Sequence, residues 1–181
     1  RVRMTQADAK VVEELDDLGR VLKAIGLTGR SLSEEYPAQV VSTGFPFLIL
    51  PLTKLSAVRK AVPNPTEILS VLKEHASQDI VIFSTETVHT DSSVHARMFA
   101  PGAGVLEDPA TGSAAGPLGA YIERHGVIPG HSSGDFIVIE QGYEMNRPSR
   151  IVYQSAAERK KRVAYVSGEV KLTAEGSFYL K

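Results

Sequence analysis

The sequence predicts an α+β domain whose strand-rich second half surrounds one buried helix. A helical run over residues 110–125 is apolar or small almost all round, which is typical of a helix enclosed by a sheet. Short segments rich in β-branched residues precede this run and dominate after it. No internal repeat and no low-complexity linker divides the 181 residues, so we expect a single domain over residues 1–181.

The part of the chain before this run mixes helices and strands. Apolar residues at three- and four-residue steps, beginning with Val12 and Leu15, predict an amphipathic helix over 8–25. Segment 46–52 is apolar nearly throughout, so we expect a strand that is buried on both faces. The other elements expected here are a strand over 39–43, a helix over 54–61, a helix over 66–75 capped by Thr66, and strands over 79–84 and 93–99.

The part of the chain after this run is expected to consist of strands. Gly126 should end the helix as its C-cap. The run of acidic and basic residues over 158–162 is most simply a solvated hairpin tip, because five residues make no extended basic face for nucleic acid. The strands expected here cover 135–140, 150–154, 163–167, 168–173 and 177–180.

Composition restricts the class of protein and the class of partner. Hydrophobic residues make up 43% of the chain and charged residues 23%, as in an ordinary soluble domain. The net charge of −1 gives no general attraction to nucleic acid or to an anionic membrane, and no apolar run is long enough to span a bilayer. The chain has no cysteine, which excludes disulfides and thiol chemistry and fits a cytoplasmic protein. It begins with Arg1, so we expect a processed or trimmed chain, or a piece of a longer one.

The segment from Gly102 to Gly116 is the strongest candidate site. Asp108 before Pro109 is typical of a helix start, because aspartate caps free amides and proline is tolerated in the first turn. The residues after Pro109 are small, so a carboxylate or phosphate can reach the backbone amides at the positive end of the helix. Asp108 and the hydroxyl of Ser113 lie at the rim of the same surface. The alternative is a capped, tightly packed helix without a ligand.

The five histidines do not predict a metal site. They lack the short repeated spacing of zinc ligands, and the chain has no thiolate, so we expect neither a metal nor a cofactor. His125, at the end of the expected helix, should interact with the negative end of the helix dipole. His95 lies on the strand that leads to the glycine loop, where it either lines the pocket or is a half-buried strand residue.

Two strings of the sequence resemble one protein family. The signature of the phenazine-biosynthesis isomerase (PhzF-like) family, relatives of diaminopimelate epimerase, is similar to Glu107-Asp-Pro-Ala-Thr-Gly-Ser-Ala114. A second string of that family resembles Gln141-Gly-Tyr-Glu-Met-Asn-Arg-Pro-Ser149 and follows the first at the same distance. The strand pair 42–51 also looks like the family and is less specific. The resemblance covers the chain from about residue 39 to residue 180.

The resemblance implies a fold and a set of site residues. Family members look like two similar halves, each a strand-rich, barrel-like sheet wrapped round one central helix, with the active site between them. This chain resembles the second, C-terminal half only. By matching position, the resemblance implies that Asp108 and Ser113 are catalytic residues that face the substrate. It implies that the substrate carboxylate is held by amides around three residues, Ala110, Thr111 and Gly112.

The resemblance also implies an isomerase that moves a proton on a small cyclic or allylic carboxylic acid. The thiol-dependent enzymes of the same fold are excluded because the chain has no cysteine. The family's acid–base glutamate belongs to the first half, and Glu107 is not its counterpart. Three hypotheses remain open: half of an isomerase that needs a first-half domain, a non-catalytic module that binds a small carboxylate or a protein partner, and a homodimer with catalytic groups from both copies.

Overall fold

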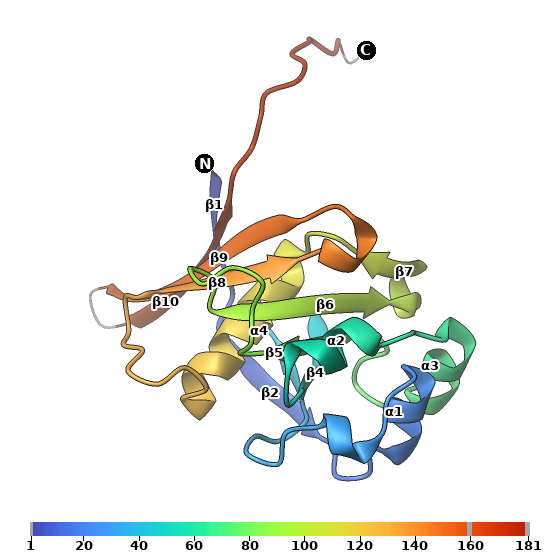
Figure 1. Ribbon diagram of the computed structural model, residues 1–181. Helices are drawn as coiled ribbons and strands as arrows, with labels where there is room; N and C mark the ends of the chain where they lie inside the picture. The colour runs from blue at the N-terminus through green and yellow to red at the C-terminus, as the bar shows by residue number, and fades with distance from the viewer. Residues whose placement is uncertain (1, 159–160, 180–181) are drawn as a thin grey trace.

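The computed structural model describes residues 2–158 and 161–179, and ten strands within these ranges join in one mixed sheet (Figure 1). The strands are β1 (Val2–Thr5), β2 (Lys10–Glu14), β3 (Gln39–Ser42), β4 (Pro46–Pro51), β5 (Ile80–Ser84), β6 (Val94–Ala100), β7 (Val105–Asp108), β8 (Phe136–Gln141), β9 (Ser149–Glu158) and β10 (Lys161–Gly168). The α-helices are α1 (Gly19–Ala24), α2 (Leu55–Lys60), α3 (Pro65–Val71) and α4 (Gly112–His125). Short 3₁₀ turns are η1 (Gly29–Ser31), η2 (Pro101–Ala103) and η3 (Tyr143–Met145).

The order of the strands requires the sheet to curl. The order is β1-β10-β9-β8-β6-β5-β4-β3-β2, and β7 pairs with β6 beside this path. β1 and β2 follow each other in the chain, yet they lie at opposite ends of this series. Nine strands laid flat would hold those ends about 38 Å apart, whereas the four residues between β1 and β2 span at most about 18 Å. The two ends of the sheet therefore approach each other.

Two hydrophobic cores lie on the two faces of the curled sheet. The inner core surrounds α4 and includes Phe47 of β4 and Val81 of β5. The outer core includes the neighbouring residues Leu48 and Ile80, which pack with α1, α2 and α3 (Figure 1). Because successive residues of a strand point to opposite faces, β4 and β5 are buried on both sides, as predicted for segment 46–52. The α+β fold with a barrel-like sheet around one central helix is confirmed.

Helix α4 is the element around which the sheet curls. Gly126 ends the helix in the left-handed conformation with φ 62°, as predicted. The helix begins at Gly112, two residues after the expected start at Ala110, with Thr111 as its N-cap. The difference arises because Asp108 is the last residue of β7 and does not cap the helix.

The predicted helix over 8–25 is wrong in its first part. Residues 10–14 form β2, an edge strand that pairs with β3, and only Gly19–Ala24 is helical. The pairing register shifts between Val11 and Glu13, and the side chain of Val12 is 52% exposed. Backbone pairing with the open edge of β3 outweighs the helical spacing of the apolar residues, because the sheet satisfies the same backbone groups.

The remaining expected elements before α4 are confirmed with two local differences. Helix α3 ends at Val71, short of residue 75, and its N-cap is Asn64 in place of Thr66. The Asn64 side chain accepts a hydrogen bond of 3.2 Å from the backbone amide of Glu67. Thr66 lies inside the first turn, where Pro65 already occupies the first helical position, as proline often does.

The C-terminal strands expected over 168–173 and 177–180 are not formed by residues 169–179. This segment runs away from the sheet (Figure 1), and its exposed apolar side chains include Val170 at 61% and Leu172 at 83%. Residue 180 lies outside the described residues. The alternating pattern predicted a strand, but a strand needs a neighbour for its backbone hydrogen bonds. The other strands after α4 are confirmed, and Glu158 opposite Lys161 confirms the hairpin of β9 and β10, whose residues 159 and 160 are not described.

Candidate active site

The loop between β7 and α4 holds Asp108 through local contacts. The hydroxyl of Thr111 donates a hydrogen bond of 2.7 Å to Asp108 Oδ2. The amide of Ala110 lies 3.5 Å from Asp108 Oδ1, at the outer limit of a hydrogen bond. The Asp108 carboxyl is therefore tied firmly through one oxygen and weakly through the other.

The second family-like string, Gln141–Ser149, binds this loop through hydrogen bonds from Gln141 and Ser149. Gln141, the last residue of β8, is 3% exposed. Its Nε2 donates to the carbonyl of Asp108 at 2.6 Å and to Thr111 Oγ1 at 3.0 Å, and its Oε1 accepts from the Thr111 amide at 3.4 Å. The hydroxyl of Ser149 donates to the carbonyl of Pro109 at 2.8 Å. The two family-like strings are thus in direct contact.

Gly142 is the glycine on which this contact depends. Its φ is +82°, and a Cβ at this position would lie 2.7 Å from the carbonyl oxygen of Pro109. A side chain at residue 142 would therefore push the loop away. Gly112 differs, since a Cβ there would meet nothing closer than Val166 at 4.0 Å and its φ is not positive. The small size of Gly112 is not required by packing or by backbone torsion.

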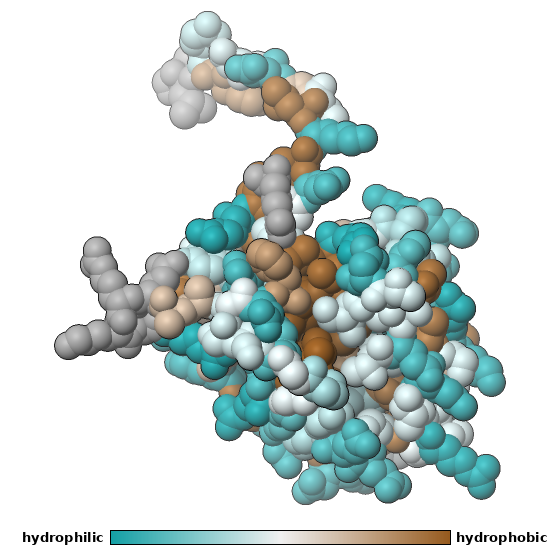
Figure 2. Space-filling view, turned by 60° about the vertical axis from the view of Figure 1, so that its left-hand side comes forward, coloured by the Kyte–Doolittle hydropathy of each residue, from teal (hydrophilic) through white to brown (hydrophobic). Residues whose placement is uncertain are grey.

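Asp108, Thr111 and Ser113 line one pocket of about 260 Å³. Much of its wall is apolar and comes from β4, β6 and the segments beside them, with Phe45, Phe47, Met98, Ala100, Ala103 and Val105. Phe45 is 51% exposed and its ring centroid lies 5.5 Å from that of Phe47. One face of the molecule has a central hollow with apolar surface (Figure 2). The pocket therefore combines a carboxyl and two hydroxyls with an apolar wall.

A second carboxyl, Asp79, lines the same pocket. It precedes β5 and is 4% exposed, and its Oδ1 accepts from the Gly102 amide at 3.0 Å. Burial raises the pKa of Asp79 above its usual value, against the opposing effect of hydrogen bonds from the amides of Gly102 and Ala103. Asp79 thereby anchors the glycine loop that precedes β7.

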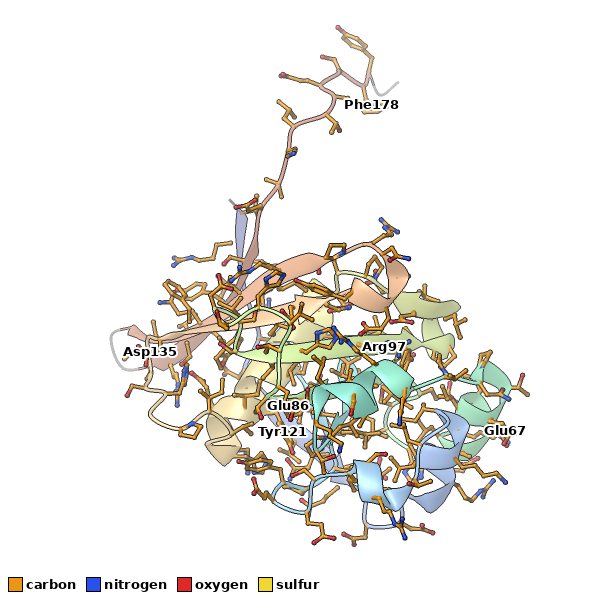
Figure 3. The ribbon with its side chains drawn as sticks, viewed as in Figure 1. Glu67, Glu86, Arg97, Tyr121, Asp135 and Phe178 are labelled. Atoms are coloured by element: carbon orange, nitrogen blue, oxygen red, sulfur yellow. The ribbon has the colours of Figure 1, made fainter. Side chains whose placement is uncertain are left out.

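The opposite face of β6 carries a buried ionic cluster. His95 is fully buried, and its ring nitrogens lie 2.8 Å from Glu140 Oε1 and 3.0 Å from Glu144 Oε1. Arg97, which points toward α2 (Figure 3), pairs with both oxygens of Glu107 at 2.8 Å. His95 thus does not line the pocket of Asp108, and it is more deeply buried than expected for a half-buried strand residue.

The charge of His95 follows from these partners. Burial would lower the pKa of His95, but its hydrogen bonds to Glu144 and Glu140 outweigh burial and raise the pKa above its usual value. The pKa values of Glu140 and Glu144 are lowered, because hydrogen bonds from amides and from His95 outweigh their own burial. The charged forms of all three residues stabilise one another.

The other predicted site residues are distributed as follows. Ala110 lines a second, larger pocket of about 760 Å³ that also includes Tyr143 and Arg150. His125 lies in the last turn of α4, as predicted, where its Nε2 contacts Gln39 at 2.9 Å and burial lowers its pKa. Its interaction with the helix dipole stays a prediction. In the part of the chain that the structure describes, no group of three or more His, Cys, Asp or Glu residues is placed to hold a metal ion. Nor does any described helix have the length and apolar character needed to cross a membrane.

Three residues at the pocket or its loop were not predicted from the sequence: Phe45, Asp79 and Gln141. Gln141 is the first residue of the second family-like string, so its position in that string was the available signal. Phe45 lies within the less specific family-like strand pair 42–51, which was a weak signal for it. Asp79 carries no such signal, and it lines the pocket because it directly precedes β5.

Comparison with known proteins gives a consistent result. The family model described as phenazine biosynthesis-like protein matches residues 6–176. Among curated relatives, the trans-2,3-dihydro-3-hydroxyanthranilate isomerase of Pseudomonas aeruginosa is 36% identical over 162 residues, which cover 88% of this chain and 52% of that protein. The uncharacterized isomerase YfhB of Bacillus subtilis is 33% identical over 151 residues, 83% of this chain and 50% of the relative.

A solved structure supports the same assignment. The crystal structure of a Bacillus anthracis phenazine biosynthesis protein of the PhzF family matches with a TM-score of 0.83 and 27% identity, over 92% of this chain and 56% of that one. The chain thus spans about half the length of the relatives it matches. It belongs to the phenazine biosynthesis-like protein family, whose relatives include named isomerases.

Proposed function

We propose that this chain forms one side of an isomerase active site that moves a proton on a small cyclic or allylic carboxylic acid. The observation that carries the proposal is the pocket in which Asp108, Thr111 and Ser113 meet an apolar wall. A carboxyl in such a pocket is suited to give, take or orient a proton. The apolar wall suits the carbon skeleton of the acid.

The acid's own carboxylate is proposed to bind at the start of α4. The described hydrogen bonds include none donated by the amides of Gly112 and Ser113, which lie at the positive end of a helix of 14 residues. The Thr111 amide, by contrast, already donates to Gln141 Oε1. We therefore expect Gly112 and Ser113 to contribute most to carboxylate binding, with Ala110 and Thr111 shaping the approach.

The name of a relative supports the substrate class. The P. aeruginosa relative is named for isomerising trans-2,3-dihydro-3-hydroxyanthranilate, a ring acid with remaining double bonds. Breaking a C–H bond beside such double bonds lets the electron pair delocalise, and a C–H bond then forms at another carbon of the same system. A reaction of this kind needs acid–base groups and no thiol, in agreement with a chain that has no cysteine.

The pocket needs a second wall to enclose a substrate. Because the chain spans about half of its relatives, we propose that a first-half domain, or a second copy of this chain in a homodimer, completes the site. Catalysis without a cofactor or metal, and a cytoplasmic location, stay predictions.

Titration with small carboxylates tests the site directly. Acetate and benzoate added to the ¹⁵N-labelled chain should shift the amide resonances of Thr111, Gly112 and Ser113. Benzoate should also shift resonances of Phe45 and Val105, because its ring meets the apolar wall. Shifts that cluster away from the start of α4 would refute the proposed site.

A further inference from the structure

Resting on the proposed function, we propose that Gln141 and Thr111 are positioning residues that assign different tasks to the two oxygens of Asp108. Oδ2 is held by the Thr111 hydroxyl, and Oδ1 is the oxygen that exchanges a proton with the substrate. In that step Oδ1 gives its proton to one carbon of the acid, where a C–H bond forms from the electrons of the adjoining double bonds. The C–H bond at the other carbon breaks, and its proton goes to the acid–base group that the other side of the site supplies.

The side-chain amide of Gln141 has a single orientation. One of its atoms lies 2.6 Å from the carbonyl oxygen of Asp108, which can only accept a hydrogen bond. The other atom lies 3.4 Å from the backbone amide of Thr111, which can only donate. The first atom is therefore the nitrogen and the second the oxygen. If the amide were rotated, its oxygen would face the carbonyl oxygen of Asp108 and its nitrogen would face the amide nitrogen of Thr111, and neither pair could form a hydrogen bond.

The orientation of Gln141 determines the direction of the Thr111 hydroxyl. With its nitrogen fixed, Gln141 also donates to Thr111 Oγ1 at 3.0 Å. The hydroxyl has one proton to donate, and the only acceptor recorded for it among the described residues is Asp108 Oδ2 at 2.7 Å. Thr111 is 5% exposed, so a hydroxyl proton pointed elsewhere would be buried without a partner, which is costly.

It follows that a proton on the Asp108 carboxyl resides on Oδ1. Oδ2 already accepts from Thr111, and a proton on that oxygen would compete with the hydroxyl. Among the described residues, the one hydrogen bond to Oδ1 comes from the amide of Ala110 at 3.5 Å, and Ala110 is exposed. Asp108 itself lines the pocket and is half-buried. The chain of hydrogen bonds from Gln141 through Thr111 leaves one carboxyl oxygen available for chemistry.

The variants that test the positioning of Asp108 are those expected to leave the protein folded. Thr111 is the N-cap of α4, but its side chain makes no capping hydrogen bond to the helix, so Thr111→Val removes the hydroxyl without removing a cap. Thr111→Ser keeps the hydroxyl. Ser149→Ala is the comparison variant, because Ser149 supports the same loop at Pro109 without touching the Asp108 carboxyl.

The first measurement uses the chain alone. In NMR spectra the Thr111 hydroxyl proton should exchange with water at least tenfold more slowly than that of Thr66, which is exposed. Thr111→Ser should keep this protection, and Gln141→Leu should lose it. A wild-type Thr111 hydroxyl that exchanges as fast as that of Thr66 overturns the positioning proposal, whether or not the protein is an isomerase.

The second measurement uses the chain assembled with a first-half domain and follows deuterium uptake by the acid. Thr111→Val should lower kcat about 100-fold with KM changed less than threefold, since misplacing a reacting group by about 1 Å has an effect of that size. Thr111→Ser should keep kcat within threefold of the wild-type value. The kcat of Ser149→Ala should be at least tenfold higher than that of Thr111→Val. Equal losses in Thr111→Val and Ser149→Ala contradict the proposal and indicate support of the loop alone. No uptake by the assembled wild-type protein contradicts the proposed function instead, while the hydroxyl measurement still decides the positioning.

Discussion

The backbone of Asp108 is held by Gln141, a residue that lies 33 positions away in the sequence. Gln141 contacts the backbone of Asp108 and the side chain of Thr111, so the carboxyl that we propose to react and its support come from different strands, β7 and β8. A carboxyl held in this way needs no large rearrangement when a substrate arrives, which is the arrangement that favours proton transfer.

Replacing Asp108 by asparagine should separate chemistry from folding. Asp108→Asn keeps an oxygen that can accept from the Thr111 hydroxyl, so the melting temperature should change by less than about 3 °C. Turnover of the assembled isomerase should fall by a factor of about 10² to 10⁴, the usual contribution of an acid–base group. Deuterium uptake and thermal unfolding of the same preparations measure the two effects. Unchanged uptake would show that Asp108 takes no part in proton transfer.

At the scale of elements, the close packing of α4 against β9 requires a glycine at residue 119. A Cβ at residue 119 would lie 2.1 Å from the ring of Tyr153, whereas a Cβ at residue 112 would make only an ordinary contact. Gly119→Ala should therefore lower the free energy of unfolding by about 1–3 kcal/mol, through overpacking. Gly112→Ala, in the first turn of the same helix, should leave it unchanged or slightly higher. Urea denaturation compares the two, and equal losses would contradict the close approach of α4 and β9.

The buried histidine of β6 should make stability depend on pH. The pKa of His95 is raised in the folded state, so its contribution is complete below the unfolded value of about 6.5 and is lost as pH rises through the folded value. The pKa values of Glu140 and Glu144 are lowered, so their contribution is complete above about 4.3 and is lost as pH falls. Stability should therefore be greatest between about pH 4.5 and 6.5 and should decline toward pH 8.

The test of that pH dependence compares two histidine variants by urea denaturation from pH 5 to pH 8. His95→Gln should flatten the decline above pH 6.5, because the group that loses its proton is gone. His89→Gln, which replaces an exposed imidazole near the same Tyr143 ring, should leave the decline in place. A decline that persists in His95→Gln would assign it to another group.

Most elements near the core could be predicted from the sequence, and those at the edges could not. Segment 46–52 is apolar at nearly every position, which only a strand buried on both faces explains. Residues 10–14 are a strand because the edge of β3 lies beside them, and the sequence does not show that edge. The proposed site was predicted at Asp108 and Ser113 through the family-like string, whereas Asp79 joins their pocket from a position before β5 that is distant in the sequence.

At the scale of the whole molecule, apolar surface remains where a partner would cover it. Phe45 is 51% and Val105 is 42% exposed beside the pocket, and Phe178 lies on the C-terminal segment that runs away from the sheet (Figure 3). Patches of this kind commonly mark interaction sites. We expect the isolated chain to pair through the pocket face.

Gel filtration with light scattering measures this association. The wild-type chain should elute as a dimer, and Phe45→Glu should convert it to a monomer, because a charge would then be buried in the interface. Val62→Glu is the control, since Val62 is 70% exposed on the loop after α2, away from the pocket. A wild-type chain that is monomeric at all concentrations would contradict pairing through this face.

The central claim is that the Asp108 pocket is one side of an acid–base site, and deuterium uptake from solvent into a cyclic dienic or allylic acid tests it most directly. The chain alone and the chain supplied with the first half of a relative such as the P. aeruginosa isomerase are compared at equal concentration. We predict uptake near background for the chain alone at concentrations where it is monomeric and rapid uptake for the assembled pair, with a loss of about 10² or more in Asp108→Asn. Rapid uptake by the isolated chain as a monomer would contradict the claim, because Asp108 would then be sufficient by itself.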